Sequence, residues 1–179
     1  IEEALLRISI PYRIYGGLRF YERLEIKNAI AYLKIIFNNN DNPSFERSIS
    51  NPTRGVGEKT LGKIRQTAQK YNISYIKASA KLIDEGSISG RGGSGLRDYL
   101  EFVAGCKSFI EDNSLSDLME LIIKESGLYS YHAKEAGEKG KTRTENLEEL
   151  ITATKNFEQS VKEDKTNTEI AENYLDVIS

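Results

Sequence analysis

The sequence has few of the residues on which catalytic and metal centres are built. Its single cysteine, Cys106, cannot form an internal disulfide. Its single histidine, His132, has no partner at triad or ligand spacing, and a structural zinc site needs four Cys or His ligands. These absences argue against a metal site and a catalytic centre. We expect His132 at the surface or an interface, and Cys106 as a packed thiol.

Long apolar runs and a large net charge are also missing. No apolar run approaches the roughly 18 residues that a membrane helix needs, and 25 basic against 27 acidic side chains leave a net charge of −2. This total hides a segregation of charge, because residues 53–72 carry +4 and residues 145–179 carry −6. Salt screens charges beyond about 8–10 Å, so the basic stretch can attract a polyanion despite the acidic end.

Apolar periodicity predicts an all-α, multi-helix fold with a short strand remnant near the N-terminus. Residues 12–15 have strand character that Gly16 ends, whereas helical spacing dominates afterwards. The chain begins at Ile1 inside a helix-like run, so we expect a segment of a longer protein. Helices are expected over about 22–37, 45–49, 61–71, 74–84, 95–112, 115–122, 147–161 and from 170 onward.

Two glycine-rich stretches imitate nucleotide-binding motifs. Residues 90–95 read G-R-G-G-S-G and fit G-x-G-x-x-G, but no strand precedes them, so we expect a flexible interhelical loop. Residues 137–142 read G-E-K-G-K-T, two residues short of a P-loop, and no buried strand leads into them. We therefore expect a loop over 133–142 that binds no nucleotide.

Residues 51–64 hold the strongest functional pattern. A short predicted helix leads through Gly55-Val56-Gly57 into a helix with Lys59 and Thr60 in its first turn. Glycines let the backbone approach a ligand, Val56 can anchor the turn in the core, and a helix N-terminus favours phosphate. Such contacts read the DNA backbone, so binding should be sequence-independent and salt-sensitive. The plain alternative is a tight helix–helix turn with ordinary capping.

This turn resembles the hairpin of helix-hairpin-helix DNA-binding modules, although Arg54 stands where proline is usual and Pro52 lies two residues earlier. The resemblance extends further along the chain. Residues 10–23, I-P-Y-R-I-Y-G-G-L-R-F-Y-E-R, look like the junction that leaves the second RecA-like domain in UvrD/PcrA/Rep-type superfamily 1 DNA helicases. Residues 51–57, N-P-T-R-G-V-G, and 143–150, R-T-E-N-L-E-E-L, resemble two further signatures in the same order, closest to the UvrD branch.

The resemblance implies a duplex-DNA-binding, regulatory 2B subdomain of an ATP-dependent 3′–5′ DNA helicase in repair or replication. Residues 1–20 would be the edge of the second RecA-like (2A) domain, 21–161 the helical 2B subdomain, and 162–179 a linker and helix returning to 2A. ATP and Mg²⁺ would act elsewhere in the parent, so this chain alone is expected to be catalytically inactive, with no cofactor or metal residues. Expected partners are duplex–single-strand junction DNA, the 1A, 1B and 2A domains of the parent, and a second copy of the protein or repair proteins, but no membrane. The expected location is cytoplasmic and nucleoid-associated.

Matching positions define the expected site. DNA contacts are expected from the hairpin and the helix after it, at Thr53, Arg54, Gly55, Val56, Gly57, Lys59, Thr60 and Lys63. Hinge or junction roles are expected for Arg19, Phe20 and Arg23, and structural roles for Arg143, Glu145 and Asn146.

Two alternatives stay open. One is a protein-interaction or self-association scaffold without direct DNA contact. The other is part of a nuclease or glycosylase, which would need carboxylates or a metal near the turn, where only Glu58 stands.

Overall fold

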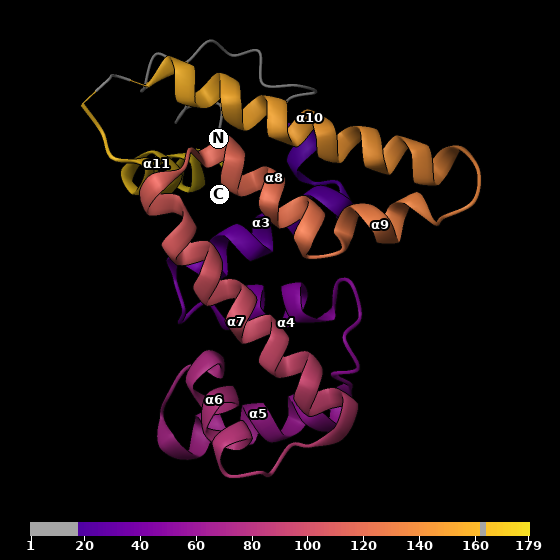
Figure 1. Ribbon diagram of the computed structural model, residues 1–179, viewed down its shortest axis with the longest axis vertical. Coiled ribbons are helices and arrows are strands. Elements are labelled where there is room, and N and C mark those ends of the chain that lie inside the picture. Colours follow the sequence, from indigo (N-terminus) through magenta and orange to yellow (C-terminus); the bar gives the residue numbers. More distant parts are fainter. Residues whose placement is uncertain (1–17, 162–163) are drawn as a thin grey trace.

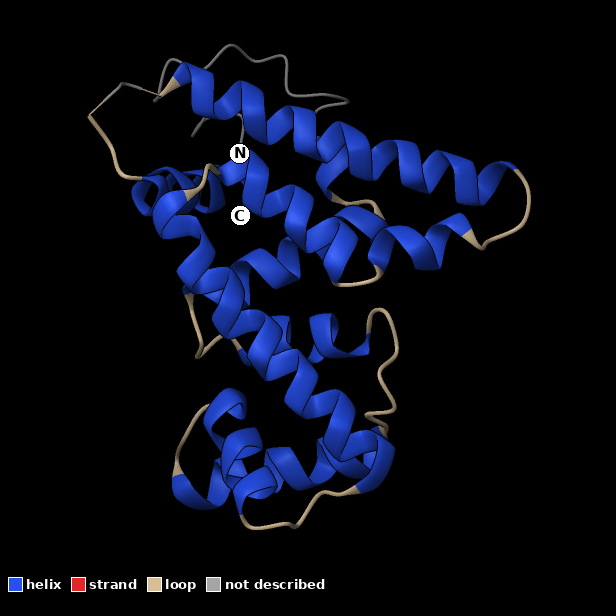
Figure 2. Ribbon diagram, in the orientation of Figure 1, coloured by secondary structure: helices blue, strands red, loops and turns tan. Residues whose placement is uncertain are grey.

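The computed structural model describes residues 18–161 and 164–179, and within these ranges all regular structure is helical (Figures 1 and 2). The all-α prediction is therefore confirmed for this part, whereas the strand expected at 12–15 lies outside the described residues. None of the described helices is long and apolar enough to cross a membrane. The described residues form ten helices, which are α2 (Leu18–Tyr21), α3 (Leu24–Phe37), α4 (Asn42–Ser50), α5 (Glu58–Tyr71), α6 (Tyr75–Asp84), α7 (Gly90–Asp112), α8 (Leu115–Glu125), α9 (Leu128–Ala133), α10 (Glu138–Ser160) and α11 (Asn167–Ile178).

Helix α3 forms the centre of the core. It packs against α4, α7, α8, α10 and α11, and ten of its fourteen residues are buried. Ile26, Leu33 and Ile35 are fully buried, and burying each such side chain contributes about 1.5–3 kcal/mol. Because neighbours surround it, α3 carries apolar residues on several faces rather than on one stripe.

Helix α7 connects the two ends of the molecule (Figure 1). Its first turns lie with α5 and α6, and its later turns pack against α8 and α11. With 23 residues it extends roughly 35 Å. It therefore links the region around α5 to the region where α11 ends the chain.

The prediction of a loop over residues 90–95 is wrong, because α7 begins at Gly90. The glycines serve close packing rather than flexibility. A Cβ at Gly93 would lie 2.8 Å from the Ile88 carbonyl oxygen, and a Cβ at Gly95 would overlap the Arg54 carbonyl oxygen. Tertiary packing thus outweighs the low helix propensity of glycine at these positions.

The region around α9 also differs from the prediction. Helix α10 begins at Glu138, so the loop expected over 133–142 is confined to the short connection after α9. A Cβ at Gly140 would overlap the Glu135 carbonyl oxygen, which explains a glycine inside the helix. The predicted surface position of His132 is wrong: the residue is 2% exposed, and its Nδ1 lies 2.7 Å from Glu135 Oε1. The packed thiol of Cys106 is confirmed, since the residue is 1% exposed, and this burial raises its pKa to about 12.

Candidate nucleic-acid interface

Residues 51–57, here called the glycine turn, join α4 to α5. Gly55 has a φ of +76°, a backbone conformation that favours glycine, and it is exposed together with Thr53. Val56 between the two glycines is half-buried and packs against the hydrophobic core. The turn is therefore held by its apolar middle residue while its glycine backbone faces outward.

The first turn of α5 has no side-chain cap. The N-cap residue is Gly57, with extended backbone angles and no capping side chain. The neighbouring helix α6 differs, because the Ser74 side chain accepts a hydrogen bond from the Lys77 N–H at 3.2 Å. Backbone N–H groups in the first turn of a helix have no intrahelical acceptor, and the helix dipole gives this end a partial positive charge. The start of α5 is thus open to an anion in a way that the start of α6 is not.

The acidic residue at this helix start shares an arginine with a second carboxylate. The Glu58 carboxylate accepts a hydrogen bond at 2.5 Å from Arg65, which also donates two hydrogen bonds to Glu46 on α4. These hydrogen bonds raise the pKa of the Arg65 guanidinium, with Glu46 contributing most. Glu58 therefore repels an approaching phosphate less than its position alone suggests.

Most of the predicted contact residues lie on or beside the exposed part of the turn. Lys59 is exposed and has no ion-pair partner among the described residues. Thr60 is half-buried in the same helical turn. Lys63 is exposed one turn later, and its Nζ donates to the Ser87 carbonyl oxygen at 3.1 Å, toward the connection between α6 and α7. The turn thus brings Thr53, Gly55 and Gly57 close to an available lysine.

Arg54 departs from the expectation of a phosphate contact. Its guanidinium turns inward, where Nη2 donates to the Tyr32 hydroxyl at 2.5 Å and to the Ser126 carbonyl oxygen at 3.0 Å. The guanidinium carbon also lies 5.7 Å from the Tyr32 ring centroid and 5.8 Å from that of Tyr99. In this arrangement Arg54 holds the turn against the core instead of pointing at a ligand.

Arg91 is a residue near the turn that the sequence interpretation missed. A Cβ at Gly55 would lie 2.8 Å from Arg91 Cγ, and Arg91 is exposed. A Cβ at Gly92 would lie 3.1 Å from the Gly55 carbonyl oxygen, so the start of α7 lies directly against the turn. The sequence does place this cation inside the G-R-G-G-S-G stretch, but that stretch was expected to form a flexible loop and not to lie against the turn.

The other two signature regions meet at the junction between α3 and α10. Arg23 Nη1 donates to Asn146 Oδ1 at 2.6 Å, and Asn146 Nδ2 donates to Glu25 Oε1 at 2.6 Å. Arg143 donates two hydrogen bonds to Glu135, and its Nε lies 3.8 Å from Glu25. Residues more than 120 positions apart therefore form one polar network, here called the junction network.

The remaining residues of these signatures lie around that network. Phe20 is fully buried beneath Arg23, whose guanidinium carbon lies 5.5 Å from its ring centroid. Arg19 is exposed, and Glu145 is an exposed residue 4.0 Å from Lys141. Next to Phe20, the Tyr21 hydroxyl is hydrogen-bonded to that of Tyr174 at 3.0 Å, which joins α2 to α11.

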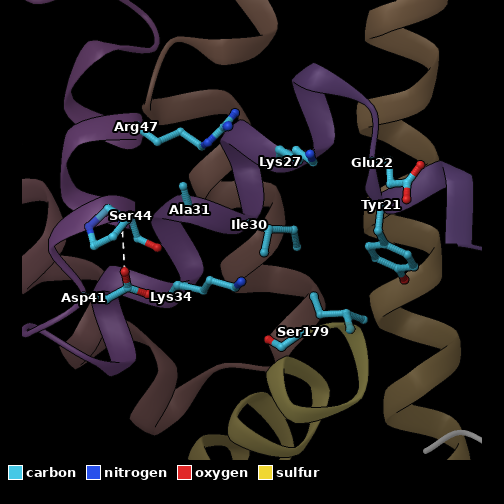
Figure 3. A pocket seen from close by; sticks show the side chains of 12 residues that line it. Tyr21, Glu22, Lys27, Ile30, Ala31, Lys34, Asp41, Ser44, Arg47 and Ser179 are labelled. Atoms are coloured by element: carbon cyan, nitrogen blue, oxygen red, sulfur yellow. Dashed lines mark hydrogen bonds between the residues drawn. The ribbon is translucent and has the colours of Figure 1, made fainter. Parts of the chain in front are cut away.

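A separate groove of about 690 Å³ lies between α3, α4 and the end of α11 (Figure 3). Lys27, Lys34 and Arg47 contribute its positive charges, and the Asp41 carboxylate within it accepts a hydrogen bond from the Ser44 N–H. No residue of the glycine turn lines this groove. In the described part of the chain, no group of three or more His, Cys, Asp or Glu residues could hold a metal ion.

The sequence that forms the glycine turn matches a known family. Residues 1–89 match the family described as UvrD-like helicase C-terminal domain. These residues therefore belong to that family, and the relatives described next extend the similarity to DNA helicases over most of the chain.

Curated relatives sharpen the assignment. The chain is 46% identical over 157 residues to DNA helicase II of Escherichia coli, covering 88% of this chain and 22% of that protein. It is 35% identical over 158 residues to the ATP-dependent DNA helicase PcrA of Leuconostoc citreum, covering 88% of this chain and 21% of that protein. It is 34% identical over 166 residues to the ATP-dependent DNA helicase PcrA of Bacillus subtilis, covering 93% of this chain and 22% of that protein. The chain thus spans about a fifth of the length of the curated relatives that it matches.

Proposed function

We propose that the chain is the 2B subdomain of an ATP-dependent 3′–5′ DNA helicase, and that it binds duplex DNA through the glycine turn as a helix-hairpin-helix. Residues 21–161 form the subdomain in this proposal, with 1–20 and 162–179 connecting it to 2A. ATP and Mg²⁺ act in the rest of the parent, which works in DNA repair or replication. The names of the relatives, DNA helicase II and ATP-dependent DNA helicase PcrA, support the parent's activity.

The observation that carries the DNA contact is the uncapped start of α5 beside a lysine without an ion-pair partner in the described part of the chain. In the proposal, a backbone phosphate accepts hydrogen bonds from N–H groups of this first turn, and Lys59 adds a charge. Thr53 and Thr60 supply hydroxyls, Gly55 and Gly57 allow the close approach, and Val56 holds the turn. Lys63 and Arg91 extend the positive surface along the duplex. Because these groups reach phosphates and no base edges, the binding is sequence-independent.

Gly57→Ala is the sharpest test, because the structure leaves room for the added methyl. A Cβ at Gly57 meets nothing within 4 Å, and its φ of −94° suits alanine. In this proposal a phosphate approaches the backbone of the turn closely, so the added methyl should lower the affinity for a duplex with a 3′ tail about tenfold at low salt. Fluorescence anisotropy across a salt titration measures this.

Gly105→Ala in α7 is the matched control, since its Cβ also meets nothing within 4 Å. It should leave the DNA affinity unchanged. Equal affinities of the Gly57→Ala and wild-type chains would refute the hairpin assignment and leave a protein-interaction scaffold as the better account.

A further inference from the structure

Arg54 places a cation under the glycine turn without a carboxylate to balance it. Its partners are a phenol hydroxyl, a backbone carbonyl and two aromatic faces, and it forms no ion pair within the described residues. Its Nε is buried and has no hydrogen-bond partner. Withdrawing a charge from water is unfavourable, and proteins usually offset this with an opposite charge. Arg54 is half-buried, so its charge is partly withdrawn from water with no carboxylate beside it, which points to a role beyond stability.

The contacts of Arg54 connect the turn to three separate parts of the fold. Its guanidinium bonds Tyr32 on α3 and Ser126 between α8 and α9, and it lies against Tyr99 on α7. The Tyr32 hydroxyl, while accepting from Arg54, donates to the Asn51 carbonyl oxygen at 2.9 Å. One phenol therefore joins the beginning and the middle of the glycine turn.

The backbone of Arg54 is fixed as firmly as its side chain. Its carbonyl oxygen lies where a Cβ at Gly95 would stand, so α7 closes directly over it. The residue that follows is Gly55, and Gly57 begins the uncapped helix two positions later. The conformation of Arg54 thus determines where the exposed backbone of the turn lies.

We infer that Arg54 is the positioning residue of the glycine turn: it holds Gly55 and Gly57 where the first N–H groups of α5 can receive a phosphate, and it does not touch the DNA. This inference rests on the proposed function. A lysine would keep the charge but not the geometry, because one ammonium group cannot reproduce a planar guanidinium that bonds Tyr32 and Ser126 while lying against aromatic rings.

Binding of a 3′-tailed duplex by Arg54→Lys and Arg54→Met chains separates positioning from charge. Both variants should bind about tenfold more weakly than wild type, and within twofold of each other. In a double-mutant cycle, Lys59→Ala should weaken binding less in the Arg54→Met chain than in wild type, because a displaced turn no longer presents Lys59. Near-wild-type affinity of Arg54→Lys, with additive effects in the cycle, would show a simple charge contribution and overturn the inference.

Backbone dynamics of the free chain test the same inference without DNA. In wild type, amide order parameters at Gly55 and Gly57 should be near 0.85, roughly the value of rigid backbone, and in Arg54→Met they should fall below about 0.6 while α10 stays rigid. Tyr32→Phe keeps the ring and removes only the hydroxyl, so it tests the same link in a folded chain and should also loosen the turn. Unchanged order parameters in both variants would overturn the inference. Failure of wild type to bind DNA would refute the proposed function, while these order parameters would still decide the role of Arg54.

Discussion

The glycine turn and the junction network use charged residues in opposite ways. At the junction, Arg23, Asn146, Glu25 and Arg143 are connected to one another by short hydrogen bonds and an ion pair. At the turn, Lys59 has no such partner among the described residues, and the helix start beside it has no cap. Groups that satisfy one another hold a fold together, whereas groups left available are suited to an external ligand.

The two regions also differ in whether backbone or side chains make their tertiary contacts. The turn is shaped by backbone contacts that require glycine, with Gly92 and Gly95 of α7 lying against Gly55 and Arg54. The junction is shaped by long side chains that reach across α3 and α10. Substitutions in the two regions should therefore separate DNA affinity from stability.

Gly95→Ala should have the largest effect, because its Cβ would overlap the Arg54 carbonyl oxygen. We expect the free energy of unfolding, measured by urea denaturation, to fall by about 3 kcal/mol through overpacking, and DNA affinity to fall with it. Gly105→Ala in the same helix has open space and should raise stability by about 0.5–1 kcal/mol. Equal stabilities of the two variants would mean that α7 does not press on the turn.

Asn146→Ala should affect stability but not DNA binding. It removes the amide that accepts from Arg23 and donates to Glu25, both across the junction. The buried Glu25 would lose a partner, so the free energy of unfolding should fall by about 2 kcal/mol. Duplex affinity at a temperature where the variant is folded should stay within about twofold of wild type. A selective loss of DNA affinity would mean that the junction belongs to the binding surface.

Lys59→Ala should affect DNA binding but not stability. We expect about fivefold weaker duplex binding and a slope of log affinity against log salt reduced by about 0.9, the value for one lost phosphate contact. Lys77→Ala is matched in charge and in its place within the first turn of a helix, but α6 is capped by Ser74. Lys77→Ala should change the duplex affinity and the salt slope by less than half of the change that Lys59→Ala causes. Equal effects of the two substitutions would indicate a non-specific loss of charge.

Acid should weaken the junction end of the molecule slightly through Glu135. Its hydrogen bond to His132, with Arg143 beside it, lowers the pKa of the Glu135 carboxyl below its usual 4.5. The unfolded chain then takes up this proton more readily than the folded one, so the stabilisation is present above pH 4.5 and is lost as pH falls further. Glu135→Gln should therefore show a flatter decline of stability than wild type between about pH 3 and 5. An identical decline would contradict this account.

Much of the fold could be predicted from the sequence, because the helices repeat apolar residues at helical spacing. Helices 75–84 and 115–125 lie close to their expected ranges, and Ser114 begins the latter with a capping box. The failures lie where glycine serves tertiary contact. Local rules predict a loop at Gly92, Gly93 and Gly95, whereas the backbone of Gly55, Ile88 and Arg54 beside them leaves little room for a Cβ.

The candidate site was predictable in its backbone and less so in its side chains. The Gly55-Val56-Gly57 pattern indicates an exposed turn before a helix, and the structure has that turn. The inward direction of Arg54 depends on Tyr32, Tyr99 and Ser126, which lie 22 to 72 positions away in the sequence. The burial of His132 similarly depends on the close approach of Gly140.

The most direct measurement of the central claim is a titration of the isotope-labelled chain with duplex DNA, followed by amide chemical shifts. If the glycine turn binds the phosphate backbone, the largest changes will lie at Gly55, Gly57 and Lys59 and will weaken with salt. The amides of α9 and α10 will stay unchanged. Changes concentrated at the junction network, with the start of α5 unaffected, would contradict the account.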